Sequence, residues 1–96
     1  MKITFKYLIG KTILVGLTYL DSDGSELEKI QFHGVVLRAD KDEGIVIKKA
    51  NSGEEFILPP DLNSIVKANP GEYCLHSSGE IVVNPELLTT WTIRKT

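Results

Sequence analysis

The sequence predicts an all-β protein: a single-domain small antiparallel β-barrel or roll, with one short helical turn near residues 60–65. Ile, Val and Thr together supply 24 of the 96 residues, against only three Ala. Such β-branched side chains fit a pleated sheet better than a helix. Apolar and polar residues also alternate along several segments, as in strands with one buried face. Turn-forming residues recur roughly every 8 to 12 positions, which is typical of small antiparallel barrels.

Length and charge narrow the class of protein further. A chain of 96 residues with 42% apolar and 25% charged residues suits one globular domain, residues 1–96, because domains typically hold about 100 to 150 residues. The net charge of -2 argues against strong non-specific attraction to nucleic acid or anionic lipid. No apolar run approaches the roughly 20 residues that span a bilayer. The single cysteine predicts a reducing, cytoplasmic location, and no membrane contact is expected.

The N-terminal segment, residues 2–9, fits either of two structures. An extended chain would place four apolar side chains on one face: Ile3, Phe5, Tyr7 and Ile9. A helix would instead group Phe5 with Leu8 and Ile9. The pattern leaves both open, whereas the regular alternation along residues 12–20 predicts a first strand.

A long second strand is predicted after a hairpin turn. Residues 21–25 are Asp-Ser-Asp-Gly-Ser, in which Asp side chains cap their own backbone and Gly accepts positive φ. The strand then runs over residues 27–39 and contains Gly34. A glycine in mid-strand allows a bulge, a sharp bend or the close approach of another backbone, and so predicts a curled sheet.

The remaining elements are short. Strands over 45–49 and 55–58 follow, and the second ends at Pro59 because proline offers no N–H to a ladder. Asp61 or Asn63 would cap the helical turn at 60–65. Three further strands, expected to cover one opening of the barrel, occupy residues 72–76, 80–83 and 89–94.

Alternation also predicts the core and leaves one aromatic residue in question. The predicted core comprises Ile13, Val15, Leu17, Ile30, Phe32, Val36, Ile45, Ile47, Phe56, Leu58, Leu75, Val82, Trp91 and Ile93. The single tryptophan, Trp91, could instead stack on a nucleic-acid base, but in a small β-domain a core position is favoured.

Two motifs resemble catalytic or metal sites but fail on spacing. Cys74 and His76 would share one face of a strand, yet zinc needs further ligands and His33 is the only other histidine. The same pair lies too far apart for a thiol–imidazole hydrogen bond, so a buried thiol beside a surface histidine is expected. The Asp21 turn lacks the Gly and Glu that a calcium loop requires at its sixth and twelfth positions. We therefore predict no catalytic, cofactor-binding or metal-ligating residue.

One basic cluster is a candidate ligand or nucleic-acid patch. It consists of Arg38, Lys41, Lys48 and Lys49. Its acidic neighbours, Asp40, Asp42 and Glu43, largely cancel its charge, so a solvated edge is favoured. A phosphate-contacting patch is the alternative, because small barrels bind single strands along such faces.

Residues 32–44 resemble the first motif of Sm-like small β-barrel proteins. The segment Phe-His-Gly-Val-Val-Leu-Arg-Ala-Asp over 32–40 has a glycine, alternating apolar residues and an aspartate six positions later. The resemblance implies a strongly bent strand in a small barrel. It does not extend to RNA binding: Gly44 stands where the family's RNA-binding Asn is expected, and the second motif's Arg-Gly pair is absent.

The sequence therefore favours a non-enzymatic protein-interaction or self-association module. Its expected partner is another protein or a second copy of the chain, since exposed strand edges suit β-augmentation. A small barrel that binds single-stranded nucleic acid is the alternative. Residues 1–50 carry eight basic and seven acidic groups, whereas residues 51–96 carry three basic and six acidic groups. The first half of the chain could therefore still form a local basic patch.

Overall fold

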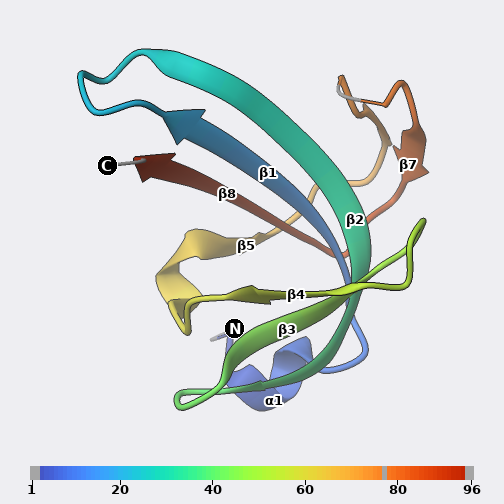
Figure 1. Ribbon diagram of the computed structural model, residues 1–96. Coiled ribbons are helices and arrows are strands. Elements are labelled where there is room, and N and C mark those ends of the chain that lie inside the picture. The colour runs from blue at the N-terminus through green and yellow to red at the C-terminus, as the bar shows by residue number, and fades with distance from the viewer. Residues whose placement is uncertain (1–2, 77, 95–96) are drawn as a thin grey trace.

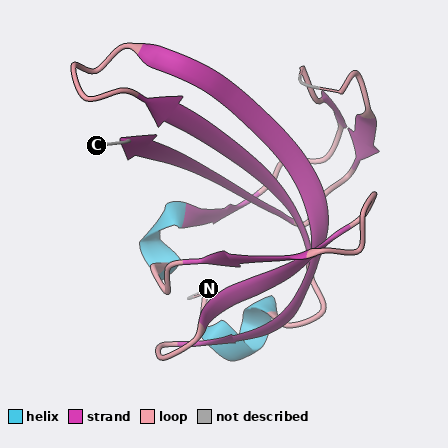
Figure 2. Ribbon diagram, viewed as in Figure 1, coloured by secondary structure: helices cyan, strands magenta, loops and turns pink. Residues whose placement is uncertain are grey.

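A computed structural model describes residues 3–76 and 78–94, which form a strongly curved six-stranded sheet and a separate two-stranded hairpin (Figures 1 and 2). The large sheet has the order β4-β3-β2-β1-β8-β5. Its strands are β1 (Thr12–Leu20), β2 (Glu26–Asp40), β3 (Gly44–Lys49), β4 (Glu55–Leu58), β5 (Ile65–Lys67) and β8 (Leu87–Arg94). The hairpin pairs β6 (Glu72–Cys74) with β7 (Ile81–Val83).

The predicted all-β class is confirmed, but the sheet is neither wholly antiparallel nor closed. Neighbouring strands run antiparallel except β1 and β8, which are parallel. The prediction of a wholly antiparallel barrel or roll is therefore wrong at that pair. The long connection from β4 to β8 lets β8 return to the far side of β1, because parallel neighbours need a crossover rather than a tight turn. Strands β4 and β5 are the two ends of the sheet, and no ladder joins them.

The N-terminal segment forms a helix and closes one end of the curved sheet. Helix α1 (Phe5–Leu8) starts at Thr4, whose hydroxyl accepts a hydrogen bond from the Tyr7 N–H. Leu8 is fully buried in the main core. Of the two structures open for residues 2–9, the helix is therefore present over 5–8, and residue 2 lies outside the described residues.

The bend predicted at Gly34 is present as a close backbone approach. A Cβ at this position would lie 2.1 Å from the carbonyl oxygen of Lys48. That is too close for any side chain, so the position requires glycine. The register between β2 and β3 also shifts between Val36 and Arg38. This bulge increases the local twist of β2 just beyond the glycine, and together these two features curve the sheet.

The predicted helical turn near 60–65 is confirmed as a short 3-10 helix, η1 (Leu62–Ser64). Of its two candidate caps, Asp61 accepts the hydrogen bond, from the Asn63 N–H. The chain then enters β5, which was not predicted. The buried hydroxyl of Thr89 donates a 2.8 Å hydrogen bond to the Ser64 carbonyl, so η1 is fixed to β8.

Most of the predicted core is buried. Nine of its fourteen members are buried: Ile13, Val15, Leu17, Val36, Ile45, Ile47, Leu58, Leu75 and Val82. The other five are only half-buried: Ile30, Phe32, Phe56, Trp91 and Ile93. Trp91 thus packs on the core without being enclosed by it. Buried apolar residues that the prediction missed are Leu8, Leu14, Val46, Ile65 and Leu87.

The β6–β7 hairpin does not cover an opening of the barrel, contrary to expectation. It packs on the convex side of the large sheet (Figure 1). Leu75 and Val82 from this segment form a small second core with Leu14 of β1. The reason is that Leu14 of β1 faces away from the main core, so this apolar side chain needs a cover on the outer face of the sheet.

Candidate binding surface at the open side of the sheet

The concave face of the sheet is half-exposed at the end away from α1. We call this surface the mouth. It consists of Tyr19, Ile30, Phe32, Lys49, Phe56, Trp91 and Ile93, all of intermediate burial. The ladder places Trp91 beside Leu17 and Leu17 beside Ile30, so these side chains continue the core face toward the β1–β2 turn. The mouth is thus a core surface that the described chain covers only in part.

An ammonium group lies over two aromatic rings in the mouth. Lys49 Nζ is 4.8 Å from the ring centre of Phe32 and 5.4 Å from that of Phe56. The two rings meet edge to face, with their centres 5.1 Å apart. The negative faces of the rings attract the cation. Within residues 3–76 and 78–94, no carboxylate forms a salt bridge with Lys49.

Strand β4 offers a free edge beside these rings. The Lys49 N–H donates a 2.8 Å hydrogen bond to the Glu54 carbonyl, which fixes the direction of alternate backbone groups in the ladder. Phe56 and Leu58 therefore point their N–H and C=O groups toward β3, and Glu55 and Ile57 point theirs away. No described strand pairs with that outer edge.

Trp91 has one polar atom that the fold leaves unpaired. Its indole Nε1 is buried and has no hydrogen-bond partner among the described residues. A buried donor without a partner costs about 1 to 3 kcal/mol. The single tryptophan therefore sits at the mouth with an unpaired N–H, and its fluorescence can report changes there.

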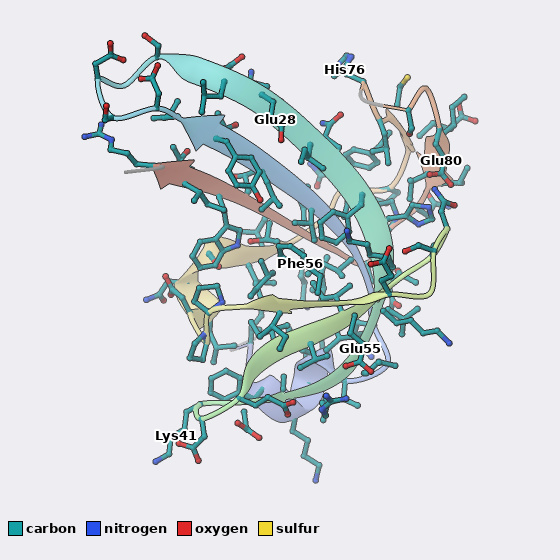
Figure 3. All side chains as sticks on the ribbon, viewed as in Figure 1. Glu28, Lys41, Glu55, Phe56, His76 and Glu80 are labelled. Carbon is teal, nitrogen blue, oxygen red and sulfur yellow. The ribbon has the colours of Figure 1, made fainter. Side chains whose placement is uncertain are left out.

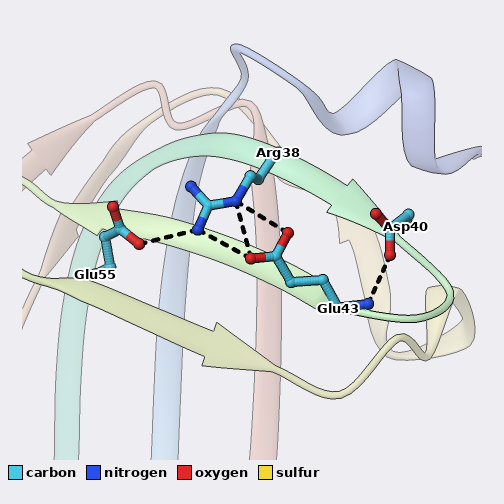
Figure 4. Close-up of polar contacts among 4 residues, drawn as sticks. All are labelled: Arg38, Asp40, Glu43 and Glu55. Carbon is cyan, nitrogen blue, oxygen red and sulfur yellow. Dashed lines mark hydrogen bonds and ion pairs between the residues drawn. The ribbon is translucent and has the colours of Figure 1, made fainter.

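The predicted basic patch is not one surface. Arg38 is held on the convex side by Glu43 and Glu55 (Figure 4), with its Nη2 at 2.9 and 3.2 Å from their oxygens. The hydrogen bonds that Arg38 donates to Glu43 and, to a lesser extent, to Glu55 raise the pKa of Arg38. Its charge is already balanced, so Arg38 has little capacity left for a phosphate group.

The three lysines of that patch lie on different parts of the molecule. Lys48 and Lys49 are consecutive in β3, so their side chains point to opposite faces of the sheet. Lys41 lies in the turn at the other end of β3, roughly 20 Å away along the strand. Figure 3 shows Lys41 at the tip of that turn and Phe56 inside the curve of the sheet. Only Lys49 belongs to the mouth.

A separate hollow of about 670 Å³ lies near α1. Its lining combines apolar side chains with two opposite charges: Ile3, Phe5, Lys41, Pro60, Asp61, Leu62, Asn63 and Ile65. Because Lys41 and Asp61 oppose each other in sign, the hollow favours neither an anion nor a cation.

The convex side carries a polar contact that fixes the hairpin. Glu80 Oε2 lies 2.8 Å from His33 Nε2, and Glu80 Oε1 accepts a 2.9 Å hydrogen bond from the Asn51 side chain. The His33 contact and then the Asn51 contact hold the pKa of Glu80 below its ordinary value of 4.5. This contact was missed because Glu80 is 47 positions from His33, and a single sequence gives no signal of that pairing.

Cys74 and His76 do not form a site in the structure. The Cys74 thiol is exposed rather than buried as expected, because its neighbours Tyr73 and Leu75 face the second core and alternation turns Cys74 to the other side. The His76 backbone N–H donates to the Gln31 side chain. In the described part of the chain, no group of three or more metal-ligating side chains gathers. The Asp21 carboxylate accepts the N–H groups of Asp23 and Ser25, as in an ordinary turn.

Comparison with known proteins gives no relative: no family model, no curated protein and no solved structure matches this chain. None of the described helices is both long enough and apolar enough to cross a membrane.

The position of Lys49 in the mouth could have been predicted from the sequence. Ile45 and Ile47 face the core, so alternation places Lys49 on the same face.

Proposed function

We propose that this protein is a non-enzymatic protein-interaction module that binds an extended segment of a partner along the free edge of β4. One observation carries the proposal: the outward backbone groups of Glu55 and Ile57 border a half-exposed aromatic surface. A partner strand gains hydrogen bonds from such an edge and places alternate side chains on the neighbouring surface.

The chemistry of β4 supports pairing with another strand. Natural edge strands commonly carry lysine, proline or inward-pointing charges that prevent pairing. The four residues of β4 are Glu-Phe-Ile-Leu, and the carboxylate of Glu55 is engaged by Arg38. Ile57 has 54% of its surface exposed. Over its four residues the edge is therefore mostly apolar and carries neither lysine nor proline.

A proline substitution tests the proposal directly. Ile57→Pro removes an N–H that points away from β3, so it blocks strand addition while leaving the β3 ladder intact. Ile57→Thr keeps the N–H and serves as the matched control. We expect the wild-type protein and Ile57→Thr to retain the same protein from a lysate of the source organism, and Ile57→Pro to lose it.

The same variants distinguish self-association from binding to another protein. If the partner is a second copy, light scattering after size-exclusion chromatography shows a dimer for the wild-type protein and a monomer for Ile57→Pro. A monomeric wild-type protein that retains no partner contradicts the proposal. So does a partner that Ile57→Pro retains as well as the wild type does.

Two further properties complete the proposal. The motif at residues 32–44 and its bent strand support a place among small barrel-type interaction domains like the Sm-like proteins. The single cysteine supports a reducing, cytoplasmic location.

Binding of single-stranded nucleic acid is the second candidate, favoured by the cation over two aromatic rings at Lys49. Aromatic stacking beside a cation is the usual way that small barrels hold single strands. Under this alternative, a labelled oligonucleotide would shift in a gel at low ionic strength and be released as salt rises. The peptide proposal expects no such shift.

A further inference from the structure

We infer that the mouth recognises a carboxylate side chain of the partner segment, with Lys49 as the pairing group. This inference rests on the proposed function and adds the chemistry of the partner: an extended acidic peptide in which the carboxylate lies two residues from an apolar side chain.

The first step is the state of the Lys49 ammonium. It is only half-exposed and lies against two rings, at 4.8 and 5.4 Å from their centres. Ring faces attract the cation but leave it without a counter-ion. A partly desolvated ammonium gains most from a charge-assisted hydrogen bond to a carboxylate.

The second step is that no described carboxylate forms an ion pair with Lys49, not even that of Glu54, whose backbone lies opposite Lys49 in the β3–β4 ladder. Glu55 neighbours Phe56 but points to the convex face, where it binds Arg38 (Figure 4). Glu80 binds His33 and Asn51 on the hairpin side. In the described part of the chain, neither of these two carboxylates reaches Lys49, so its charge is available to a partner.

The third step is the register of an added strand. A strand paired to the free edge of β4 lies about 4.8 Å beyond it. Its side chains on the concave side fall next to Phe56, whose ring centre is 5.4 Å from Lys49 Nζ. Residues i and i+2 of a strand share a face. In a partner strand with an acidic residue and an apolar residue at that spacing, the acidic side chain can therefore contact Lys49 while the apolar side chain packs on the aromatic rings.

The number of cations favours a peptide over a nucleic acid. Lys49 is the one cation among the seven residues that define the mouth, and Arg38, Lys41 and Lys48 lie elsewhere. A groove for single-stranded nucleic acid needs positive charge along its length to follow successive phosphates. One charge matches one carboxylate.

Selection from a phage library of short random peptides tests the inference, with the full-length wild-type protein as bait. We expect enriched peptides to carry Asp or Glu two positions from an apolar residue. A synthetic copy of the most enriched peptide should bind Lys49→Gln about tenfold more weakly than wild type. Lys49→Arg should retain the affinity. Lys48→Gln, which removes the neighbouring charge on the opposite face, is the matched control and should change affinity by less than about twofold.

The outcomes separate the two proposals. Enriched peptides without acidic residues, or equal losses for Lys48→Gln and Lys49→Gln, overturn the carboxylate inference while strand addition stands. If the wild-type protein enriches no peptide, the proposed function fails with it. An oligothymidylate that binds the wild type but not Lys49→Gln overturns the peptide assignment in favour of nucleic acid. If Lys49→Gln melts at a lower temperature than Lys49→Arg, the carboxylate is tested on the peptide instead. The acidic residue of the peptide is then replaced by its amide, and the wild-type protein should bind the amide peptide about tenfold more weakly.

Discussion

Substitution of Gly34 by alanine should disrupt the bend of β2. An added Cβ would lie 2.1 Å from the Lys48 carbonyl oxygen, 2.9 Å from its carbon and 3.1 Å from a methyl group of Ile47. The nearest atoms belong to backbone, so the β2–β3 ladder must open. Overpacking of this kind costs about 1 to 3 kcal/mol, and each weakened ladder hydrogen bond adds about 1 kcal/mol. We expect a loss of about 3 kcal/mol, a large part of the roughly 5 to 15 kcal/mol that stabilises a domain.

Urea denaturation, followed by the fluorescence of Trp91, measures this loss. With a slope of about 1.5 kcal/mol per molar urea, the midpoint should fall by about 2 M. Gly16→Ala is the matched control in β1, because its Cβ would meet only the Thr90 methyl group at an ordinary 3.5 Å. Its stability should change by less than about 1 kcal/mol. Equal midpoints for the two variants would refute the account of the bend.

Three further predictions concern the β6–β7 hairpin and the contact between β8 and η1. Leu75→Ala should cost about 2 to 3 kcal/mol, because Leu75 is 1% exposed in a small core; hydrogen exchange should show the β6–β7 hairpin opening while the large sheet stays protected. Thr89→Val should cost about 1 to 2 kcal/mol in thermal or urea unfolding, because it leaves the Ser64 carbonyl without its donor. The folded pKa of Glu80 is depressed below 4.5, mainly by His33, so its contribution to stability is present above pH 4.5 and is lost as pH falls through the lower folded pKa. Urea midpoints between neutral and acidic pH should show this loss, and Glu80→Gln should make it smaller, with the remainder due to other groups such as Asp23, whose pKa is also lowered; an unchanged acid profile in Glu80→Gln would contradict it.

The elements in the first half of the chain could be predicted well from local sequence patterns. The Asp-rich turn, the strand over 12–20 and the glycine bend depend on neighbours in the chain, so alternation and turn residues suffice to place them. The three-residue strand β5 and the parallel pairing of β8 depend on contacts between distant residues. Hydrophobic periodicity carries no information about which strands become neighbours.

The candidate site was predicted only in part. Arg38 and Lys41 are close to Lys48 and Lys49 in sequence, yet the sheet separates them, because adjacent strand residues face opposite sides and a hairpin turn lies a full strand length away. Phe56 was assigned to the core. Its side chain does lie on the core face of the sheet, but it is half-exposed rather than buried. Exposure depends on what covers the open end of the sheet, and that follows from the absence of a ladder between β4 and β5 rather than from any local pattern.

Amide chemical shifts of the full-length protein, recorded by NMR during titration with the most enriched acidic peptide, test binding at the mouth most directly. The account predicts the largest shifts at Glu55 and Ile57 on β4 and at Lys49, with the β6–β7 hairpin unchanged. Shifts confined to the hairpin or to the hollow near α1, with β4 unaffected, would contradict it.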